Sequence, residues 1–161
     1  MEDASLASLP PLAPVGVEIV RAPGARDLPL PAYETPGAAG MDLRAAVDEP
    51  VTLAPGETCS VSLGILLAIP PGYEAQVRPR SGLAARSGVT LLNSPGTLDS
   101  DFRGIVHAIV INHGNEPFMI RRGDRIAQLV VAPVARVAWR EVETLDVTPR
   151  GANGFGSTGA R

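Results

Sequence analysis

The chain has 161 residues, a formal net charge of -3 at pH 7 and 45% hydrophobic residues, which is enough for the core of one compact domain. The acidic balance argues against bulk electrostatic binding to DNA or RNA, so we expect no nucleic-acid partner. All 14 basic residues are arginines, which excludes Schiff-base chemistry and a P-loop lysine but supplies planar donors suited to phosphate.

The N-terminal segment begins with acidic residues and contains prolines. It has neither the basic start nor the long apolar stretch of a secretory signal, and no run in the chain approaches the length of a membrane span. We therefore expect residues 1–14 to be disordered, and we expect a cytoplasmic protein without a membrane partner.

The following chain is typical of short β-strands separated by Gly, Pro and Asp. Alternation is clearest where Tyr73, Ala75 and Val77 would share one face of a strand. Many short strands with regular turn signals predict an all-β sandwich or barrel. The expected strands cover residues 17–21, 51–55, 59–69, 73–79, 88–93, 104–112, 118–123 and 126–134. Cys59, the single cysteine, lies in one of them and is interpreted as inert, since an internal disulfide is impossible.

One short helix is expected at Ser81–Ser87, with a serine that can cap its start. The sequence shows no internal repeat and no interdomain linker. We expect one β-domain over residues 15–145 and a mobile C-terminal arm over residues 146–161, because this last segment has few apolar residues other than Phe155 and cannot fold on its own core.

Five segments look unlike structural strand or turn sequence, and these are the candidates for chemistry. They cover residues 39–45, 79–88, 93–104, 123–130 and 150–159. In the second, Arg80 precedes Ser81 and Gly82 at the expected helix start, where free backbone N–H groups and the guanidinium would bind an anion. An ordinary capped helix is the alternative interpretation.

The segment Asn93–Gly104 carries turn signals and predicts a hairpin. Its backbone and the Asn93 amide offer paired donors and acceptors that can read the edge of a flat base. Asp99 could accept a proton from water, and Phe102 could stack on a sugar or base. A solvated acidic turn is the alternative for Asp99 and Asp101.

In residues 123–130, Gln128 alternates with Ile126 and Val130, so all three are expected on one face of a strand. A glutamine among apolar neighbours needs a hydrogen-bond partner, which is either a ligand or simply the backbone. In residues 150–159, Arg150 can bind phosphate and Phe155 can stack on a base from a glycine-rich mount. A glycine-rich end that is simply disordered is the alternative.

Together, the five segments resemble the five motifs of the trimeric dUTP pyrophosphatase (dUTPase) family, in their usual order, between about residues 17 and 159. The resemblance implies a β-jelly-roll homotrimer with three active sites at subunit interfaces. It implies Mg²⁺-assisted hydrolysis of dUTP to dUMP and pyrophosphate, which limits uracil incorporation into DNA and supplies dUMP for dTMP synthesis.

The resemblance also implies roles for individual residues. Asp42 would hold Mg²⁺ through water, Asp99 would orient and deprotonate the attacking water, and Gln128 would help to place it. The residues implied in substrate binding are Arg80, Ser81, Gly82, Asn93, Thr97, Leu98, Asp99, Phe102, His107, Gln128, Arg150, Phe155, Gly156, Ser157 and Thr158. Of these, Arg80, Ser81 and Gly82 would grip phosphate oxygens, and residues 150–158 would close over the nucleotide.

The chain departs from the family at Phe102, where tyrosine is usual, and at Asn153, where glycine is common. A dCTP deaminase on the same fold is one alternative, although that family uses a glutamate near the position of Asp99. A non-catalytic nucleotide-binding trimer with a regulatory role is another. The presence of Asp99, Gln128 and the C-terminal motif favours water attack on phosphorus over both.

Overall fold

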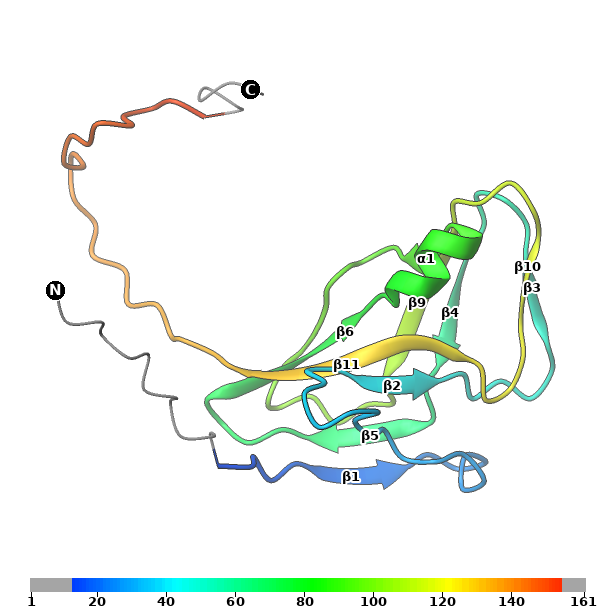
Figure 1. Ribbon diagram of the computed structural model, residues 1–161. Helices are drawn as coiled ribbons and strands as arrows, with labels where there is room; N and C mark the ends of the chain where they lie inside the picture. The colour runs from blue at the N-terminus through cyan, green and yellow to red at the C-terminus, as the bar shows by residue number, and fades with distance from the viewer. Residues whose placement is uncertain (1–12, 155–161) are drawn as a thin grey trace, which may run out of the picture.

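The computed structural model describes residues 13–154 and consists of short antiparallel strands with one helix (Figure 1). The strands are β1 (Glu18–Arg21), β2 (Met41–Arg44), β3 (Val51–Leu53), β4 (Thr58–Ser62), β5 (Ile65–Ala68), β6 (Tyr73–Arg78), β7 (Val89–Leu91), β8 (Gly96–Leu98), β9 (His107–Asn112), β10 (Phe118–Ile120) and β11 (Arg125–Pro133). The helix is α1 (Ser81–Ser87). The all-β prediction is confirmed. None of these elements is a helix long and apolar enough to cross a bilayer.

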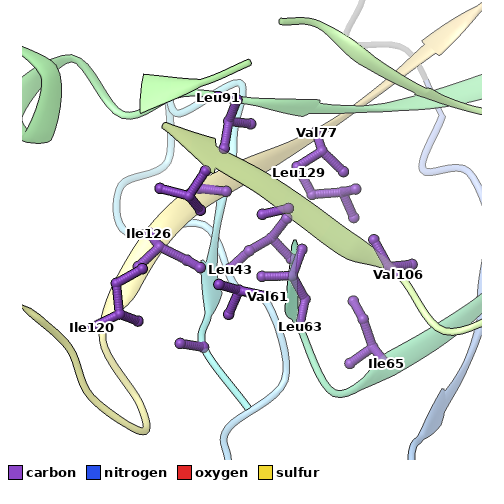
Figure 2. Packing of buried hydrophobic residues seen from close by; sticks show 14 of the residues in the cluster. Leu43, Val61, Leu63, Ile65, Val77, Leu91, Val106, Ile120, Ile126 and Leu129 are labelled. Carbon is purple, nitrogen blue, oxygen red and sulfur yellow. The ribbon is translucent and has the colours of Figure 1, made fainter. Parts of the chain in front are cut away.

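Two larger sheets form the body of the domain. One has the strand order β2-β11-β6-β8, and the other has the order β4-β9-β7; two-stranded pairs β1-β5 and β10-β3 complete it. The expected alternation in β6 is present, because Ala75 and Val77 are buried while Glu74, Gln76 and Arg78 are not. Figure 2 shows side chains from both larger sheets meeting in a single apolar core. Its labelled members are Leu43, Val61, Leu63, Ile65, Val77, Leu91, Val106, Ile120, Ile126 and Leu129.

Helix α1 covers the residues expected for it, but its start differs from the prediction. The N-cap residue is Arg80, which is extended at φ -95° and ψ 122° and makes no side-chain cap bond. Ser81 is already the first helical residue, so it does not cap the helix as expected. The helix ends at Gly88, whose φ of 66° is a left-handed conformation that glycine adopts without strain.

The predicted hairpin at Asn93–Gly104 is wrong. Strand β7 pairs with β9, whereas β8 pairs with β6 in the other larger sheet. The chain therefore crosses from one sheet to the other between Leu91 and Gly96 and does not fold back on itself. Val89 and Leu91 are buried in the core from the β4-β9-β7 side, and this long-range burial outweighs the local turn signals.

Strand β11 ends at Pro133, and its last anchor is the Val134 amide, which donates to the Gly72 carbonyl at 2.9 Å. Residues 134–153 are exposed, and Figure 1 shows residues 134–154, the extended segment, running away from the sheets. The domain limits at residues 15–145 and 146–161 stay a prediction. Cys59 is half-buried in β4, and burial raises the pKa of its thiol, as expected of an inert strand residue.

Candidate active site

Three candidate residues that are far apart in sequence, Asp42, Arg80 and Gln128, meet at one pocket. It has a volume of about 360 Å³, and we call it the Asp42 pocket. Its lining residues are Glu34, Asp42, Arg80, Ser81, Gly82, Arg125 and Gln128. The structure thus brings together the phosphate-binding candidates, the metal candidate and one of the two catalytic candidates.

Strand register places two of these side chains. In the antiparallel ladders of β11, Gln128 lies opposite Asp42 of β2 on one side and opposite Arg78 of β6 on the other. Directly opposed residues point to the same face of a sheet. Because Leu43 and Val77 fill the core from the inner face, Asp42 and Gln128 project from the outer face. Arg80 follows the end of β6 and reaches back to them.

A bulge in β11 changes the expected pattern around Gln128. Arg125 lies opposite Arg44, but Ala127 lies opposite Leu43, so Ile126 is one extra residue on this strand. Both Ile126 and Ala127 are buried. The expectation that Ile126 shares a face with Gln128 is therefore wrong, because the bulge interrupts the two-residue alternation. Its consequence is that Arg125 lines the Asp42 pocket.

Asp42 is bound by two guanidinium groups. Arg80 donates from Nε to Oδ1 at 2.8 Å and from Nη2 to Oδ2 at 3.3 Å, and Arg125 donates from Nη1 to Oδ2 at 3.1 Å. The side chains of Asp42 and Arg80 are only 15% and 25% exposed. Charge-assisted, forked pairs of this kind fix the orientation of both partners. Arg80 also donates from Nη1 to the Arg125 carbonyl at 3.2 Å.

The hydrogen-bond partner that Gln128 needs is a backbone carbonyl. Its Nε2 donates to the Pro79 carbonyl at 2.8 Å, which ties β11 to the chain just before Arg80. Its Oε1 packs so closely on Gly40 that a Cβ at that residue would collide with it. The absence of a side chain at Gly40 therefore leaves room for the Gln128 amide.

A second set of candidates lies at the other end of β6. Leu98, at the end of β8, lies opposite Ala75, and Asp99 follows it as an exposed residue. Phe102 is 41% exposed, and its ring covers Gly104, where a Cβ would lie 2.6 Å from the ring tip. The Arg103 guanidinium holds this turn by donating to the carbonyls of Ser100 and Phe102, both at 2.8 Å. We call residues 99–103 the Asp99 turn.

The remaining candidates for binding the base lie between the end of β7 and the start of β9. Asn93 is exposed, with its amide nitrogen next to Gly96, and Thr97 is exposed on β8. His107 begins β9, and its exposed ring nitrogen Nδ1 lies 2.9 Å from the Ile105 carbonyl. None of these residues lines the Asp42 pocket.

Within one chain, the two catalytic candidates do not meet. Asp99 lies beyond the Ala75 end of β6, while Arg80 lies beyond its Arg78 end. The strand between Ala75 and Arg78 alone spans about 10 Å at 3.3 Å per residue. The chain therefore separates the proposed water-activating carboxylate from the Asp42 pocket.

The C-terminal candidates are only partly described. Arg150 is exposed and donates from Nε to the Asn153 carbonyl at 3.0 Å. Phe155, Gly156, Ser157 and Thr158 lie outside the described residues, as do residues 1–12.

No role was predicted from the sequence for Glu34, Gly40 or Arg125, although Gly40 and Arg125 lie in the candidate segments 39–45 and 123–130. Gly40 lies two residues before Asp42 in the first candidate segment, and its lack of a side chain was the feature that could have marked a close contact. The position of Arg125 in the pocket could not be predicted, because two-residue alternation does not reveal the bulge in β11. Glu34 lies in a loop without any pattern, and no signal in the sequence marks it.

Comparison with known proteins places the chain in a family. The family model described as dUTPase matches residues 26–159. The deoxyuridine 5'-triphosphate nucleotidohydrolase of Maricaulis maris is 57% identical over 136 residues, covering 83% of this chain and 90% of the relative. The protein of that name from Methylocella silvestris is 56% identical over 149 residues, covering 91% and 93%.

Solved structures agree on the fold. The G164S mutant of the Staphylococcus bacteriophage 80alpha dUTPase, solved with dUpNHpp, superposes with a TM-score of 0.80 at 22% identity. The match covers 90% of this chain and 99% of the phage protein. The family model spans most of the chain and both curated relatives exceed half identity over nearly their full length, so the chain belongs to the dUTPase family.

Proposed function

We infer that the protein hydrolyses dUTP to dUMP and pyrophosphate. Family membership supports the reaction, and the assembly of Asp42, Arg80 and Gln128 in one pocket is the observation that carries it. A nucleoside triphosphate needs neutralised phosphate charge and an oriented water for attack at the α-phosphorus. Arg80, together with a Mg²⁺ ion held through Asp42, would neutralise the phosphate charge, and Gln128 would help to orient the water.

Phosphate binding is the role we assign to the start of α1. The first turn of a helix leaves backbone N–H groups without intrahelical acceptors, so those of Ser81 and Gly82 can donate to phosphate oxygens. Arg80 would join them by exchanging its forked contact with Asp42 for a phosphate group, which offers the same fork geometry. Gln128 would help to orient the attacking water and the phosphates.

Mg²⁺ fits the donors of this pocket as an ion held mainly by the triphosphate and by water. Asp42 and Glu34 bring two carboxylates to the pocket, and residues 13–154 contain no cluster of three or more His, Cys, Asp or Glu side chains that could hold a metal. Mg²⁺ usually keeps several waters and takes one or two carboxylates. Asp42 would hold it through water, and the bound ion would neutralise phosphate charge.

Asp99 is the proposed general base, and its separation from the Asp42 pocket supports an active site that is shared between subunits. Asp99 and Arg80 lie beyond opposite ends of β6, which favours a site that draws these two groups from different subunits. A homotrimer in which Asp99 of one subunit faces the Asp42 pocket of another would unite them. Asn93, Thr97, Leu98, Phe102 and His107 would then bind the uracil and the sugar, and residues 150–158 would close the site.

The extended segment supports assembly. Its apolar side chains stand in water in a single chain, with Trp139 exposed by 92%, Leu145 by 84% and Val147 by 97%. Apolar side chains in such numbers along one segment indicate a partner surface. The domain itself offers an apolar groove of about 710 Å³ between β1, β2, β5 and β11, with Ile19, Met41 and Leu129 in its lining. The segment of a second copy would cover this surface.

One assay separates the proposed reaction from its alternatives. The protein is incubated with dUTP and, separately, with dCTP in the presence of Mg²⁺, and pyrophosphate and ammonia are measured. Pyrophosphate from dUTP supports the proposal, whereas ammonia from dCTP would identify a deaminase. Absence of both products together with tight nucleotide binding would indicate a regulatory trimer. The cytoplasmic location belongs to the same proposal, and cell fractionation tests it.

A further inference from the structure

Asp42 has two arginine partners, and only one of them has a proposed role in binding dUTP. Arg80 contacts both carboxylate oxygens of Asp42, whereas Arg125 contacts only Oδ2, at 3.1 Å. The same Nη1 of Arg125 lies 4.0 Å from Glu34, whose side chain is 62% exposed. The shorter contact and the greater burial of Asp42 make the carboxylate of Asp42 the main partner of Arg125.

The position of Arg125 depends on a specific backbone feature. In unbroken two-residue alternation, residue 125 would lie on the face opposite to Gln128, because the two are three positions apart. The bulge instead buries Ile126 and places Arg125 beside Asp42. Bulges commonly re-aim a side chain next to an active site.

When a phosphate group binds, the two arginines would differ in which group they contact. Arg80 directly precedes Ser81 and Gly82 in the chain, so its guanidinium is the one that can bind the same phosphate group as their backbone N–H groups. A carboxylate that loses a forked partner and has no other would be free to turn toward water. Arg125 comes from a different strand and binds Oδ2 independently of Arg80.

We propose that Arg125 is a positioning residue of the dUTP reaction, which keeps the Asp42 carboxylate in the pocket while Arg80 moves from Asp42 to the triphosphate. This rests on the proposed function of the Asp42 pocket. It predicts that Arg125 acts through Asp42 and makes no phosphate contact of its own. A direct contact between Arg125 and phosphate is the competing possibility. The two possibilities predict different effects of the Arg125 substitution when Asp42 is also substituted.

The test is a double-mutant cycle read by binding rather than by turnover. Calorimetry measures the affinity of the full-length protein for dUpNHpp with Mg²⁺, for wild type, Arg125→Gln, Asp42→Asn and the double variant. We expect Arg125→Gln to weaken binding about tenfold in the wild-type background and less than about twofold in the Asp42→Asn background. Equal losses in both backgrounds would overturn the proposal in favour of direct phosphate contact.

Two more variants and two more properties of Arg125→Gln test the same proposal. Arg125→Lys keeps a cation for Asp42 and should recover part of the affinity, whereas Arg121→Gln removes an exposed arginine from the preceding turn and should match wild type. The Mg²⁺ concentration for half-maximal activity should rise in Arg125→Gln while the melting temperature stays constant. An unchanged Mg²⁺ requirement would contradict the proposal, as would a lysine variant no better than glutamine. Failure of wild type to release pyrophosphate from dUTP would instead refute the proposed function.

Discussion

Gln128 and Asp42 lie directly opposite each other in the β2–β11 ladder, and Gln128 also binds the carbonyl of Pro79 at 2.8 Å. This pairing links three strands at the point where the chain leaves β6 for Arg80. The glutamine thus connects the carboxylate of the pocket to the backbone that carries its arginine. Changes that displace this amide should therefore affect catalysis more than folding.

Gly40→Ala is the mildest such change. The new methyl group would collide with Oε1 of Gln128 and push the amide out of place. We expect kcat/KM for dUTP to fall roughly ten- to hundredfold, because small misplacements of positioning groups are costly in catalysis. Gly37→Ala is the matched control, since no atom lies within 4 Å of its added Cβ. Equal activities of the two variants would show that Gln128 does not depend on Gly40.

Asp99→Asn removes the proposed general base while keeping the shape of the side chain. We expect kcat to fall by about 10²–10⁴, the usual contribution of general base catalysis. The affinity for dUpNHpp should change little, because the lost function is the activation of water. Asp101→Asn alters an exposed carboxylate two residues away and should leave kcat near that of wild type. A kcat of Asp99→Asn within tenfold of wild type would exclude this role.

Asp27 should make stability depend on pH. Its hydrogen bond with the Arg122 guanidinium, at 2.6 Å, holds the pKa of Asp27 below its ordinary value of 3.8. A lowered folded-state pKa contributes stability that is present above about pH 4 and is lost as the pH falls through the folded-state pKa. Asp27→Asn should therefore lower the melting temperature at pH 7 but have a shrinking effect toward pH 3.

The neighbouring carboxylate provides the control for this prediction. Asp48 lies 3.8 Å from Arg122 Nη1 and is 98% exposed, so Asp48→Asn should change the melting temperature little at any pH. A destabilisation by Asp27→Asn that is equally large at pH 3 and pH 7 would show that the ion pair is not its source.

Removal of residues 150–161 should preserve folding and abolish most turnover. The buried core cluster and the apolar residues packed against it all lie within residues 17–131, whereas Arg150 and the proposed base-stacking Phe155 belong to the deleted segment. We expect an unchanged melting temperature and a loss of kcat/KM of at least about hundredfold, because positioning of the nucleotide is lost. Deletion of residues 1–12 is the control and should retain activity. Unfolding of the shorter chain would show that the segment is structural.

Trp139 should report assembly, because it is the only tryptophan in the chain. It is 92% exposed in a single chain, so burial by a second copy would shift its fluorescence emission to shorter wavelengths. We expect a trimeric mass by sedimentation and an emission maximum that moves to longer wavelengths on dilution. Trp139→Asp should weaken the trimer, whereas Arg140→Asp on the same segment should do so less. A monomeric wild type that hydrolyses dUTP would refute the composite site.

The sequence predicted the alternation in β6 and the span of α1, because both depend on neighbouring residues. It did not predict the start of α1, where Arg80 is the N-cap residue and Ser81 makes no cap bond. The partner of β8 could not be predicted, since strand pairing depends on burial across the whole domain. For the same reason the ion pair of Arg125 with Asp42 was missed, because it depends on a bulge that changes the face of one side chain.

The proposed composite site, with Asp99 and Arg80 supplied by different subunits, has a genetic consequence. A chain without the carboxylate at residue 99 and a chain without the guanidinium at residue 80 should each be inactive when expressed alone. Co-expressed, they would form mixed particles in which some interfaces receive both intact groups, one from each parent. Two null alleles should therefore rescue one another, which cannot occur in an enzyme whose subunits carry complete sites.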